Sequence, residues 1–338
     1  MSGQGKTGGK IGVLLVNLGT PDDTSVPAVR RYLREFLSDR RVIEAPQWLW
    51  QIILNLVILP FRPKKSAEGY RTVWMQDEDE SPLRYWTKMQ AENLAVRFHE
   101  PDVLVRYAMR YGNPSIPSVM TEMQAAGCDR FLVMPLYPQY SAATNATVVD
   151  RVAGHLAGIR YQPTVRVLPP YYDDPAYIDA LAASVDRDLL DGAHLLMSFH
   201  GLPQECADKG DPYPDHCRAT ADALAAKLSL QPGDYTMTFQ SRFGPKKWLQ
   251  PYTDPTVEQR VGEGVRNMVA ITPGFSADCL ETIEEIGIAT AEVFAEAGGE
   301  NFTRIDCLNA DPAHIDMLEV LARRELGGWV DGGGGDGR

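Results

Sequence analysis

Cysteine is scarce in this sequence, and no two cysteines form a CxxC pair. There are five, an odd number, at Cys128, Cys206, Cys217, Cys279 and Cys307. This pattern is typical of isolated, reduced thiols in a cytosolic protein. The first ten residues, MSGQGKTGGK, lack the apolar core of a signal peptide. We therefore expect a cytoplasmic protein.

Basic charge and nucleotide-binding motifs are also lacking. The formal net charge is −12, which excludes nucleic acid as an expected partner and disfavours an anionic membrane surface. An anionic substrate needs local arginines to overcome this charge. No GxGxxG or GxxxxGKS/T motif follows an expected strand, and Gly8-Gly9-Lys10 precedes the first one. A nucleotide-dependent enzyme is therefore disfavoured.

No apolar run is long enough to cross a bilayer, which takes ~20 residues. The longest, WLWQIILNLVILPF over 48–61, is interrupted by Gln51 and Asn55. A buried helix is the favoured interpretation of this run. The alternative is the apolar lip of a pocket, which can rest on a membrane interface with the help of Trp48 and Trp50. Such a protein is peripheral to the inner membrane.

Short apolar runs alternate with longer amphipathic segments along the chain. Runs rich in Val, Ile and Leu are typical of strands buried on both faces. We expect eight strands, over Ile11–Asn17, Val103–Ala108, Arg130–Leu136, Thr164–Leu168, His194–Phe199, Tyr235–Phe239, Met268–Thr272 and Arg304–Leu308. Helical patterns lie between them, including 281–297, and this alternation indicates parallel sheets covered by helices.

The eight strands divide into four and four at the stiff segment Pro169–Tyr172. The predicted fold class is α/β, with two similar Rossmann-like halves and a cleft between them. Each half is a doubly wound, four-stranded parallel sheet, over residues 10–170 and 171–326. The stretch 327–338 is mostly glycine, and we expect it to be a disordered tail.

Ligands of doubly wound folds bind at the carboxyl ends of strands. Four notable segments fall at such ends, namely NLGTP at 17–21, RYG at 110–112, YPQYS at 137–141 and SFHGLP at 198–203. His200 stands where a strand gives way to a Gly-Pro turn, which exposes its imidazole. An imidazole can accept a proton near neutral pH or bind ferrous iron, although a lone histidine more often only hydrogen-bonds a loop. The segment 240–254 predicts only a well-packed loop.

An acidic segment follows the seventh strand and opens a helix. Asp278 is placed to cap this helix, and acids early in a helix suit the helix dipole. Glu281 and Glu285 are four residues apart and share a helical face. Aimed into the cleft, they form a line of carboxylates facing His200. Two carboxylates and one imidazole are a weak, open ligand set, which suits an enzyme that releases its metal, because a structural site closes its shell.

Seven stretches of the chain resemble the ferrochelatase family and occur in the family's order. They are LLVNLGTPD (14–22), SPLRYWT (81–87), MRYGNPS (109–115), PLYPQYS (135–141), MSFHGLP (197–203), TFQSRFGPKKWLQPYTD (238–254) and PGFSADCLETIEE (273–285). Any one is a weak signal, but seven in order are a strong one. The resemblance is greatest to the type found in Gram-negative bacteria. It implies two Rossmann-like halves of the chelatase kind with a porphyrin in the cleft.

The activity implied by the resemblance is that of a metal-chelating lyase. The family inserts ferrous iron into protoporphyrin IX to give protohaem, the last step of haem biosynthesis, and two protons leave. Fe²⁺ and the porphyrin are substrates, and no prosthetic group is implied. Two alternatives stay open: a coproporphyrin ferrochelatase, and a porphyrin or haem carrier without catalysis. The preference for Fe²⁺ over Zn²⁺ and the face of metal entry stay open as well.

The resemblance also implies roles for individual residues. His200 matches a histidine assigned to metal binding and to pyrrole proton abstraction, and Glu281 matches the metal-binding glutamate opposite it. Glu285 matches a further acid of the line, and Asp278 a carboxylate that helps position the histidine. Positions near the porphyrin propionates or the pocket wall are matched by Arg110, Tyr111, Ser81 and Tyr137, and the apolar lip by residues 48–61.

Three features depart from the family's pattern. Leu18 stands on the metal's side of the ring, where other relatives have methionine or tyrosine, so a direct ligand from that face is in doubt. Cys279 replaces a histidine of animal relatives. Cys307 is followed by a glycine-rich tail without cysteine, so no iron–sulfur cluster is expected. Without the C-terminal extension of animal relatives, a monomer is expected.

Overall fold

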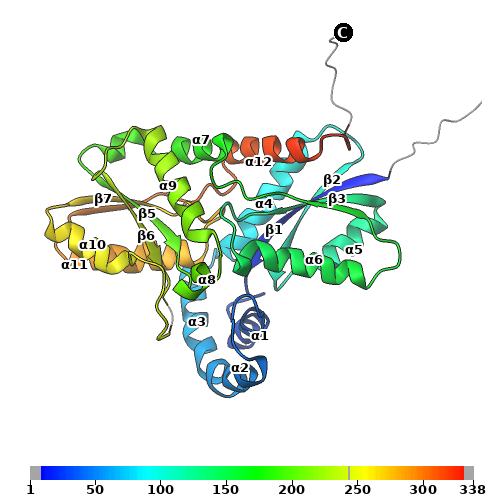
Figure 1. The fold of residues 1–338 in the computed structure, drawn as a ribbon, viewed down its shortest axis with the longest axis horizontal. Coiled ribbons are helices and arrows are strands. Elements are labelled where there is room, and N and C mark those ends of the chain that lie inside the picture. Colours follow the sequence, from blue (N-terminus) through cyan, green and yellow to red (C-terminus); the bar gives the residue numbers. More distant parts are fainter. Residues whose placement is uncertain (1–8, 243, 331–338) are drawn as a thin grey trace, which may run out of the picture.

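Two four-stranded sheets, parallel throughout, form the body of the molecule (Figure 1). The computed structural model describes residues 9–242 and 244–330. The first sheet has the order β2–β1–β3–β4, with β1 (Lys10–Gly19), β2 (Val103–Tyr111), β3 (Cys128–Pro135) and β4 (Thr164–Val167). The second has the equivalent order β6–β5–β7–β8, with β5 (His194–His200), β6 (Tyr235–Gln240), β7 (Asn267–Ile271) and β8 (Asn301–Arg304). The predicted fold class is confirmed.

Helices join the strands of each sheet. Those between β1 and β4 are α1 (Val26–Leu37), α2 (Gln47–Ile53), the π-helix η1 (Leu54–Ile58), α3 (Leu59–Val73), α4 (Pro82–Arg97), α5 (Ile116–Ala125), the π-helix η2 (Ala142–Ala146) and α6 (Thr147–Ala157). After β4 come α7 (Pro175–Ser184), the 3₁₀-helix η3 (Arg187–Leu190), α8 (Gln204–Asp208), α9 (Tyr213–Leu228), α10 (Thr253–Gly262), the π-helix η4 (Glu281–Thr290), α11 (Ala291–Glu296) and α12 (Pro312–Glu325).

Several helices begin with a side-chain cap followed by proline. A Ser or Asp oxygen accepts a backbone N–H of the first turn, and proline occupies an early position that needs no amide hydrogen. The capping residues of α1, α4, α5, α7 and α12 are Ser25, Ser81, Ser115, Asp174 and Asp311. These starts place the helices that cover the sheets.

The two sheets share one hydrophobic core. A single cluster of buried residues includes Val13 and Leu132 of the first sheet and Leu195 and Ile271 of the second. Helix α12, which ends the second half, packs against α4 and β3 of the first (Figure 1), and its Leu318 is fully buried in the same cluster. The predicted boundary at residue 170 therefore separates the two sheets but not two independent cores.

Two sequence-based predictions at the C-terminal end differ from the structure. Strand β8 ends at Arg304, where the predicted strand begins. The prediction was misplaced because Ile305 and Leu308, which are apolar, belong to the core beyond the strand. Residues 327–330 make contacts that a disordered tail lacks: the Arg166 guanidinium lies 4.0 Å from the Trp329 ring centroid. The rest of the predicted tail, 331–338, lies outside the described residues.

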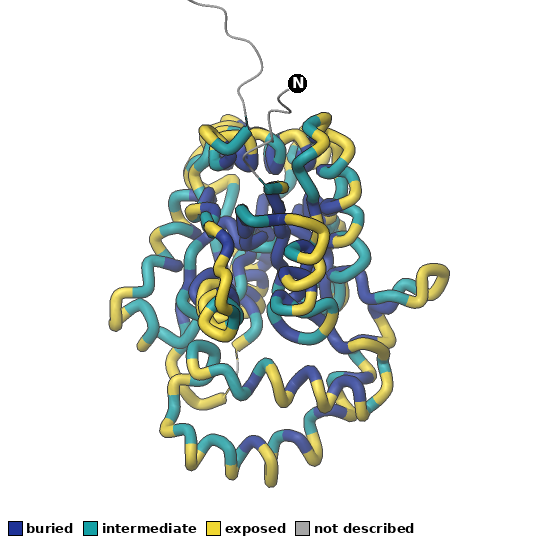
Figure 2. Tube along the Cα trace, turned by 90° about the vertical axis from the view of Figure 1, so that its right-hand side faces the viewer, coloured by how far each residue is buried: buried dark blue, intermediate teal, exposed yellow. Residues whose placement is uncertain are grey.

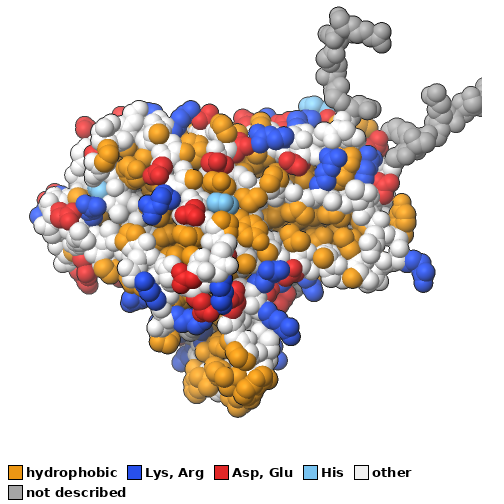
Figure 3. Space-filling view, in the orientation of Figure 1, with side chains coloured by type: hydrophobic (Ala, Val, Ile, Leu, Met, Phe, Trp, Pro, Cys, Tyr) orange, Lys and Arg blue, Asp and Glu red, His pale blue; other side chains and the backbone are white. Residues whose placement is uncertain are grey.

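The apolar run 48–61 is mostly exposed, with Leu54 and Leu59 as its buried residues, so the favoured buried-helix interpretation was wrong for most of the run. Helices α1 to α3 project from the body (Figure 1), and the outer edge of the projection is largely exposed (Figure 2). Trp48, Leu56 and Phe61 are 72%, 70% and 75% exposed, and apolar side chains cover the tip (Figure 3). We call this exposed part of residues 48–61 the apolar lip. Throughout 9–242 and 244–330, no helix is both long and apolar enough to cross a membrane.

Candidate active site

His200 is the last residue of β5 and lies beside Gln240, the last residue of β6. Its Nδ1 is 2.7 Å from the carbonyl oxygen of Gly201. Because a carbonyl only accepts hydrogen bonds, Nδ1 carries a hydrogen, and in the neutral imidazole this leaves the lone pair on Nε2. A side chain at position 201 would meet the Gln240 carbonyl at 2.7 Å, so glycine is needed where the two strand ends approach. The half-buried imidazole thus presents a basic nitrogen.

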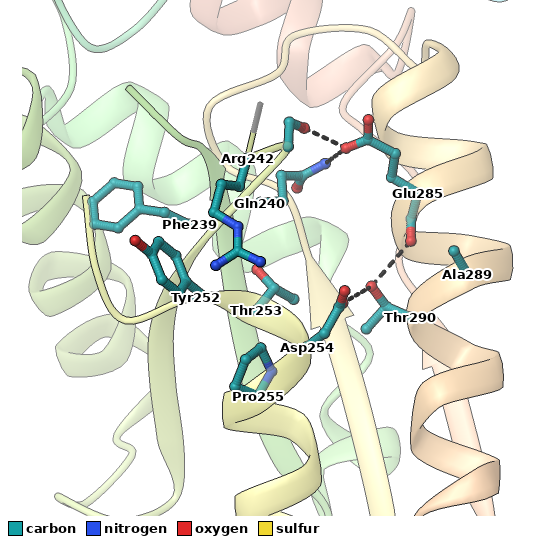
Figure 4. A pocket seen from close by; sticks show the side chains of 11 residues that line it. Phe239, Gln240, Arg242, Tyr252, Thr253, Asp254, Pro255, Glu285, Ala289 and Thr290 are labelled. Carbon is teal, nitrogen blue, oxygen red and sulfur yellow. Dashed lines mark hydrogen bonds between the residues drawn. The ribbon is translucent and has the colours of Figure 1, made fainter. Parts of the chain in front are cut away.

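The acidic segment forms a helix at the same edge of the second sheet. Gln240 connects the two, because its Nε2 donates to the Glu281 carbonyl (2.7 Å) and to Glu285 Oε2 (3.1 Å). Ser241 Oγ donates to the same Glu285 oxygen (Figure 4). The structure therefore brings together the strand end that carries His200 and the helix that carries Glu281 and Glu285.

The acidic helix differs in type from the predicted α-helix. From Glu281 to Thr290 it is a π-helix, with i→i+5 hydrogen bonding, and it becomes α-helical only from Ala291. Thr290 Oγ1 reaches back five residues to donate to the Glu285 carbonyl at 3.0 Å. π-Helical segments are rare and occur frequently at functional sites. Periodicity in the sequence cannot distinguish the two types, because residues four apart lie close to one another in both.

Burial raises the pKa of Glu285, and the nearby Glu281 raises it further. The hydrogen bond from Ser241, the charge of His200 and the hydrogen bond from Gln240 act in the opposite direction. Glu285 is thus within electrostatic reach of both Glu281 and His200. Neighbouring acids and a histidine that interact in this way can hold and pass on a proton.

A cavity of about 280 Å³ opens beside Glu285 (Figure 4). It is lined by Phe239, Gln240, Ser241, Arg242, Tyr252, Thr253, Asp254, Pro255, Glu285, Ala289 and Thr290. Its outer wall includes the exposed residues Arg242 and Asp254. The volume is at the lower end of the ~300–1,000 Å³ range of small-molecule sites. The cavity gives the Glu285 carboxyl a polar surrounding that reaches the surface.

Asp278 is buried, and both of its carboxylate oxygens have partners. Oδ1 accepts from Thr282 Oγ1 (2.8 Å) and from Arg304 Nη1 (2.7 Å), and Oδ2 accepts from Asn309 Nδ2 (2.7 Å). Asp278 therefore holds the start of the acidic helix. The helix has Leu280 as its N-cap and no side-chain cap, so the predicted capping role of Asp278 was wrong, because its carboxylate is taken up by three side chains. The implied role in positioning His200 stays a prediction.

Arg110 and Tyr111 are the last two residues of β2 and share a partner that sequence analysis did not single out. Asp39 accepts from the Arg110 guanidinium and from the Tyr111 hydroxyl, the latter at 2.9 Å. Arg110 Nε also donates to the Thr147 carbonyl at 2.8 Å. Tyr111 is fully buried against Phe36. The Asp39 carboxylate partly neutralises the arginine that was predicted to lie near a propionate.

Three further predicted pocket residues lie in the first half. Ser81 is buried and caps α4 by accepting from Arg84 N. Tyr137 is also buried, and its hydroxyl has no hydrogen-bond partner within the described ranges. Leu18 packs between the halves, beside the cluster that contains Cys279. Their predicted contacts with porphyrin stay predictions.

The end of β1 occupies the place in the first sheet that His200 occupies in the second. Gly19 is the last residue of β1 and lies beside Tyr111, as His200 lies beside Gln240. Its φ is +117°, and a Cβ there would lie 1.8 Å from the Tyr111 carbonyl oxygen. The backbone therefore requires glycine at this position.

Sequence analysis missed several residues that surround the acids. Tyr32 and Tyr70, from α1 and α3, make an edge-to-face contact with their ring centroids 6.3 Å apart. Burial raises the pKa of both hydroxyls, and the charge of Glu281 raises it further. Gln240 and Ser241 lie in a segment that predicted only a packed loop. The position of Gln240 and Ser241 at the carboxyl end of a strand was a signal that could have identified them, since His200 was identified by the same rule.

The candidate metal ligands His200 and Glu281 are a set of two. No group of three or more His, Cys, Asp or Glu side chains is arranged to hold a metal ion in the part of the chain that the structure describes. A set this small leaves most of a metal's coordination positions to other ligands.

Comparison with solved structures defines the class of fold. The chain is similar to SirB from Bacillus subtilis, with a TM-score of 0.55 and 11% identity, covering 94% of this chain and 96% of that one. It is also similar to CbiX, described as the terminal enzyme of sirohaem biosynthesis in denitrifying bacteria, with a TM-score of 0.51 and 15% identity over 93% and 99% of the two chains. The molecule is thus a two-halved α/β protein of the chelatase fold.

Comparison of sequences defines the family. The ferrochelatase family model matches residues 10–326. A ferrochelatase of Rhizobium meliloti is 52% identical over 95% of this chain and 96% of its own, and one of Bradyrhizobium diazoefficiens is 51% identical over 95% and 94%. The chain belongs to the ferrochelatase family.

Proposed function

We propose that this protein inserts ferrous iron into protoporphyrin IX and releases two pyrrole protons. The observation that carries the proposal is that the end of β5, with His200, and the acidic helix, with Glu281 and Glu285, meet at one sheet edge through Gln240. Membership of the ferrochelatase family supports it. Metal insertion needs a base for the pyrrole protons and a weak ligand for the iron, and this site contains residues suited to both.

His200 takes a pyrrole proton on Nε2, because Nδ1 is engaged with the Gly201 carbonyl. Glu281, with His200, presents the iron to the ring. Glu285 accepts the proton from the His200 side and releases it to the polar cavity at its back, and its raised pKa suits this exchange. Each step uses a group that the acidic helix or the strand end holds in place.

The test is anaerobic insertion by the purified protein, followed by the change in porphyrin absorbance. Wild type is expected to turn over protoporphyrin, whereas His200→Ala is expected to bind porphyrin and lose insertion. His99→Ala is the matched control, since His99 is exposed and precedes β2 at the far end of its strand. Near-normal turnover by His200→Ala means that the role given to His200 is wrong.

The same assay separates the alternative substrates and classes. Coproporphyrin has two more carboxylates than protoporphyrin, and faster insertion into it would make the protein a coproporphyrin ferrochelatase. Porphyrin binding without insertion would make it a carrier. Running the assay with Zn²⁺ beside Fe²⁺ gives the metal preference, which imidazole and carboxylate ligands alone do not fix.

We also propose that the protein is a cytoplasmic monomer that touches the inner membrane through the apolar lip. The exposed Trp48, Leu56 and Phe61 support this contact, and the exposed Lys64 and Lys65 follow them on α3. Large exposed apolar patches are typical of interaction sites. Sedimentation equilibrium tests the monomer, and vesicle binding tests the contact.

A further inference from the structure

The turn that precedes the acidic helix is held by residues from both halves of the molecule. Asp278 lies in this turn, three residues before Glu281. Its main-chain N–H donates to Asn309 Oδ1 at 2.8 Å, and its Oδ2 accepts from Asn309 Nδ2 at 2.7 Å. One amide side chain thus grips both the backbone and the carboxylate of Asp278, which fixes the orientation of the turn.

Asn309 is itself fixed in an uncommon backbone conformation. Its φ is +44°, in the left-handed region that asparagine tolerates better than most residues. Its carbonyl oxygen accepts from Gln90 Nε2 at 2.9 Å and from His314 Nδ1 at 2.6 Å. The two-point grip on Asp278 therefore depends on partners from α4 and α12.

Gln90 carries the connection to the first half. It is fully buried on α4, and its Nε2 donates to the carbonyls of both Ser276 and Asn309 at 2.9 Å. Its own Oε1 has no hydrogen-bond partner within 9–242 and 244–330. An unpaired buried acceptor is unfavourable for folding, so this amide carries a cost in stability. Asn17 Nδ2, at the end of β1, reaches Ser276 Oγ at 3.4 Å.

We propose that Gln90 and Asn309 are positioning residues that set where Glu281 stands relative to His200. Gln90 joins Ser276 to Asn309, and Asn309 joins that pair to Asp278, from which the acidic helix begins. The first half thereby controls the placement of an acid in the second half. This inference rests on the proposed function of Glu281 and His200, and neither amide contacts the substrate in it.

The variants are chosen to remove the amides without new strain. Gln90→Met keeps the length of the buried side chain and removes both hydrogen bonds. Asn309→Gly keeps the left-handed backbone accessible and removes only the grip. The matched control is Thr220→Val on α9, which removes a fully buried hydroxyl whose partners are Gln139 and the carbonyls of Tyr172 and His216.

The measurements are kcat and KM for ferrous iron, porphyrin affinity by fluorescence quenching, and Tm. Each variant is expected to lose between about tenfold and a hundredfold in kcat/KM for iron, the scale of a displaced reacting group. Porphyrin affinity stays within about twofold of wild type, because the ring sites are untouched, and the double variant loses no more than the worse single one. Thr220→Val keeps the wild-type kcat/KM for iron.

Three outcomes overturn the proposal. They are wild-type kinetics in both variants, additive losses in the double variant, and losses of iron kinetics, porphyrin affinity and Tm in parallel, which a merely structural role produces. If lowering the temperature alone restores the iron kinetics of Gln90→Met, that result also indicates a merely structural role and overturns the proposal. If the wild-type protein itself inserts no metal, the proposed function has failed, and that result is read before any variant is compared.

Discussion

At the scale of single residues, the number of partners separates acids that hold the fold from acids that are available for chemistry. Asp278 has three hydrogen-bond partners on its two oxygens, one of them Arg304. Glu285 has two neutral donors on one oxygen and a cavity beside it. The sequence placed both in one acidic line, because the partners come from distant segments that no local spacing reveals.

The raised pKa of Glu285 predicts how its contribution to stability varies with pH. A carboxyl whose pKa in the folded state exceeds its ordinary value of 4.5 favours folding below that value. This contribution is lost as the pH rises through the folded-state pKa. Glu285→Gln is therefore expected to gain stability relative to wild type as the pH increases from about 4.5 to 8, measured by urea unfolding.

Glu284→Gln provides the baseline for this prediction. Glu284 lies on the same helix, and its replacement removes the same charge. The difference between Glu285→Gln and wild type should change with pH more steeply than the Glu284→Gln difference does. Parallel curves for the two variants would contradict the stated electrostatic surroundings of Glu285.

At the scale of elements, the sequence predicted those whose periodicity is set by burial on a regular surface. All eight strands overlap their predicted ranges, although β8 does so only at Arg304. The failures have physical causes. Ile305 and Leu308 are buried without belonging to a strand, and the apolar lip is exposed although its composition is that of a core. An apolar composition indicates that a segment favours apolar surroundings. It does not show whether the rest of the chain provides those surroundings.

The apolar lip is expected to bind lipid vesicles. Phe61→Ser and Leu56→Ser should each lower the partition coefficient about tenfold, because burying one such side chain is worth about 1.5 kcal/mol. Cosedimentation with phosphatidylcholine vesicles, with and without phosphatidylglycerol, measures it. Val96→Ser is the control, since Val96 is 72% exposed on α4. Equal binding by all variants would show that the lip does not meet lipid.

At the scale of the whole molecule, the two halves are structurally equivalent but energetically joined. Their strand orders correspond one to one, and yet one cluster of buried side chains includes both sheets and α12. Two sheets were predictable from the alternation of strands and helices. The return of α12 to the first half was not, because an apolar helical face does not show which apolar surface it packs against.

The shared core predicts a single cooperative unfolding transition. Leu318→Ala on α12 should lower the free energy of unfolding by about 3 kcal/mol, the usual cost of a fully buried leucine. Tryptophan fluorescence, which comes mainly from the first half because four of the six tryptophans precede residue 170, should follow the same curve as circular dichroism. Two separated transitions would mean that the halves fold independently.

The pairing of Gly19 with His200 at equivalent strand ends has a consequence for redesign. The scaffold offers the same corner twice, but only one copy has room for a functional group, since at the other a methyl group would overlap the Tyr111 carbonyl. An equivalent reactive centre in the first half thus cannot be engineered by simple grafting. It demands that β1 and β2 first be moved apart.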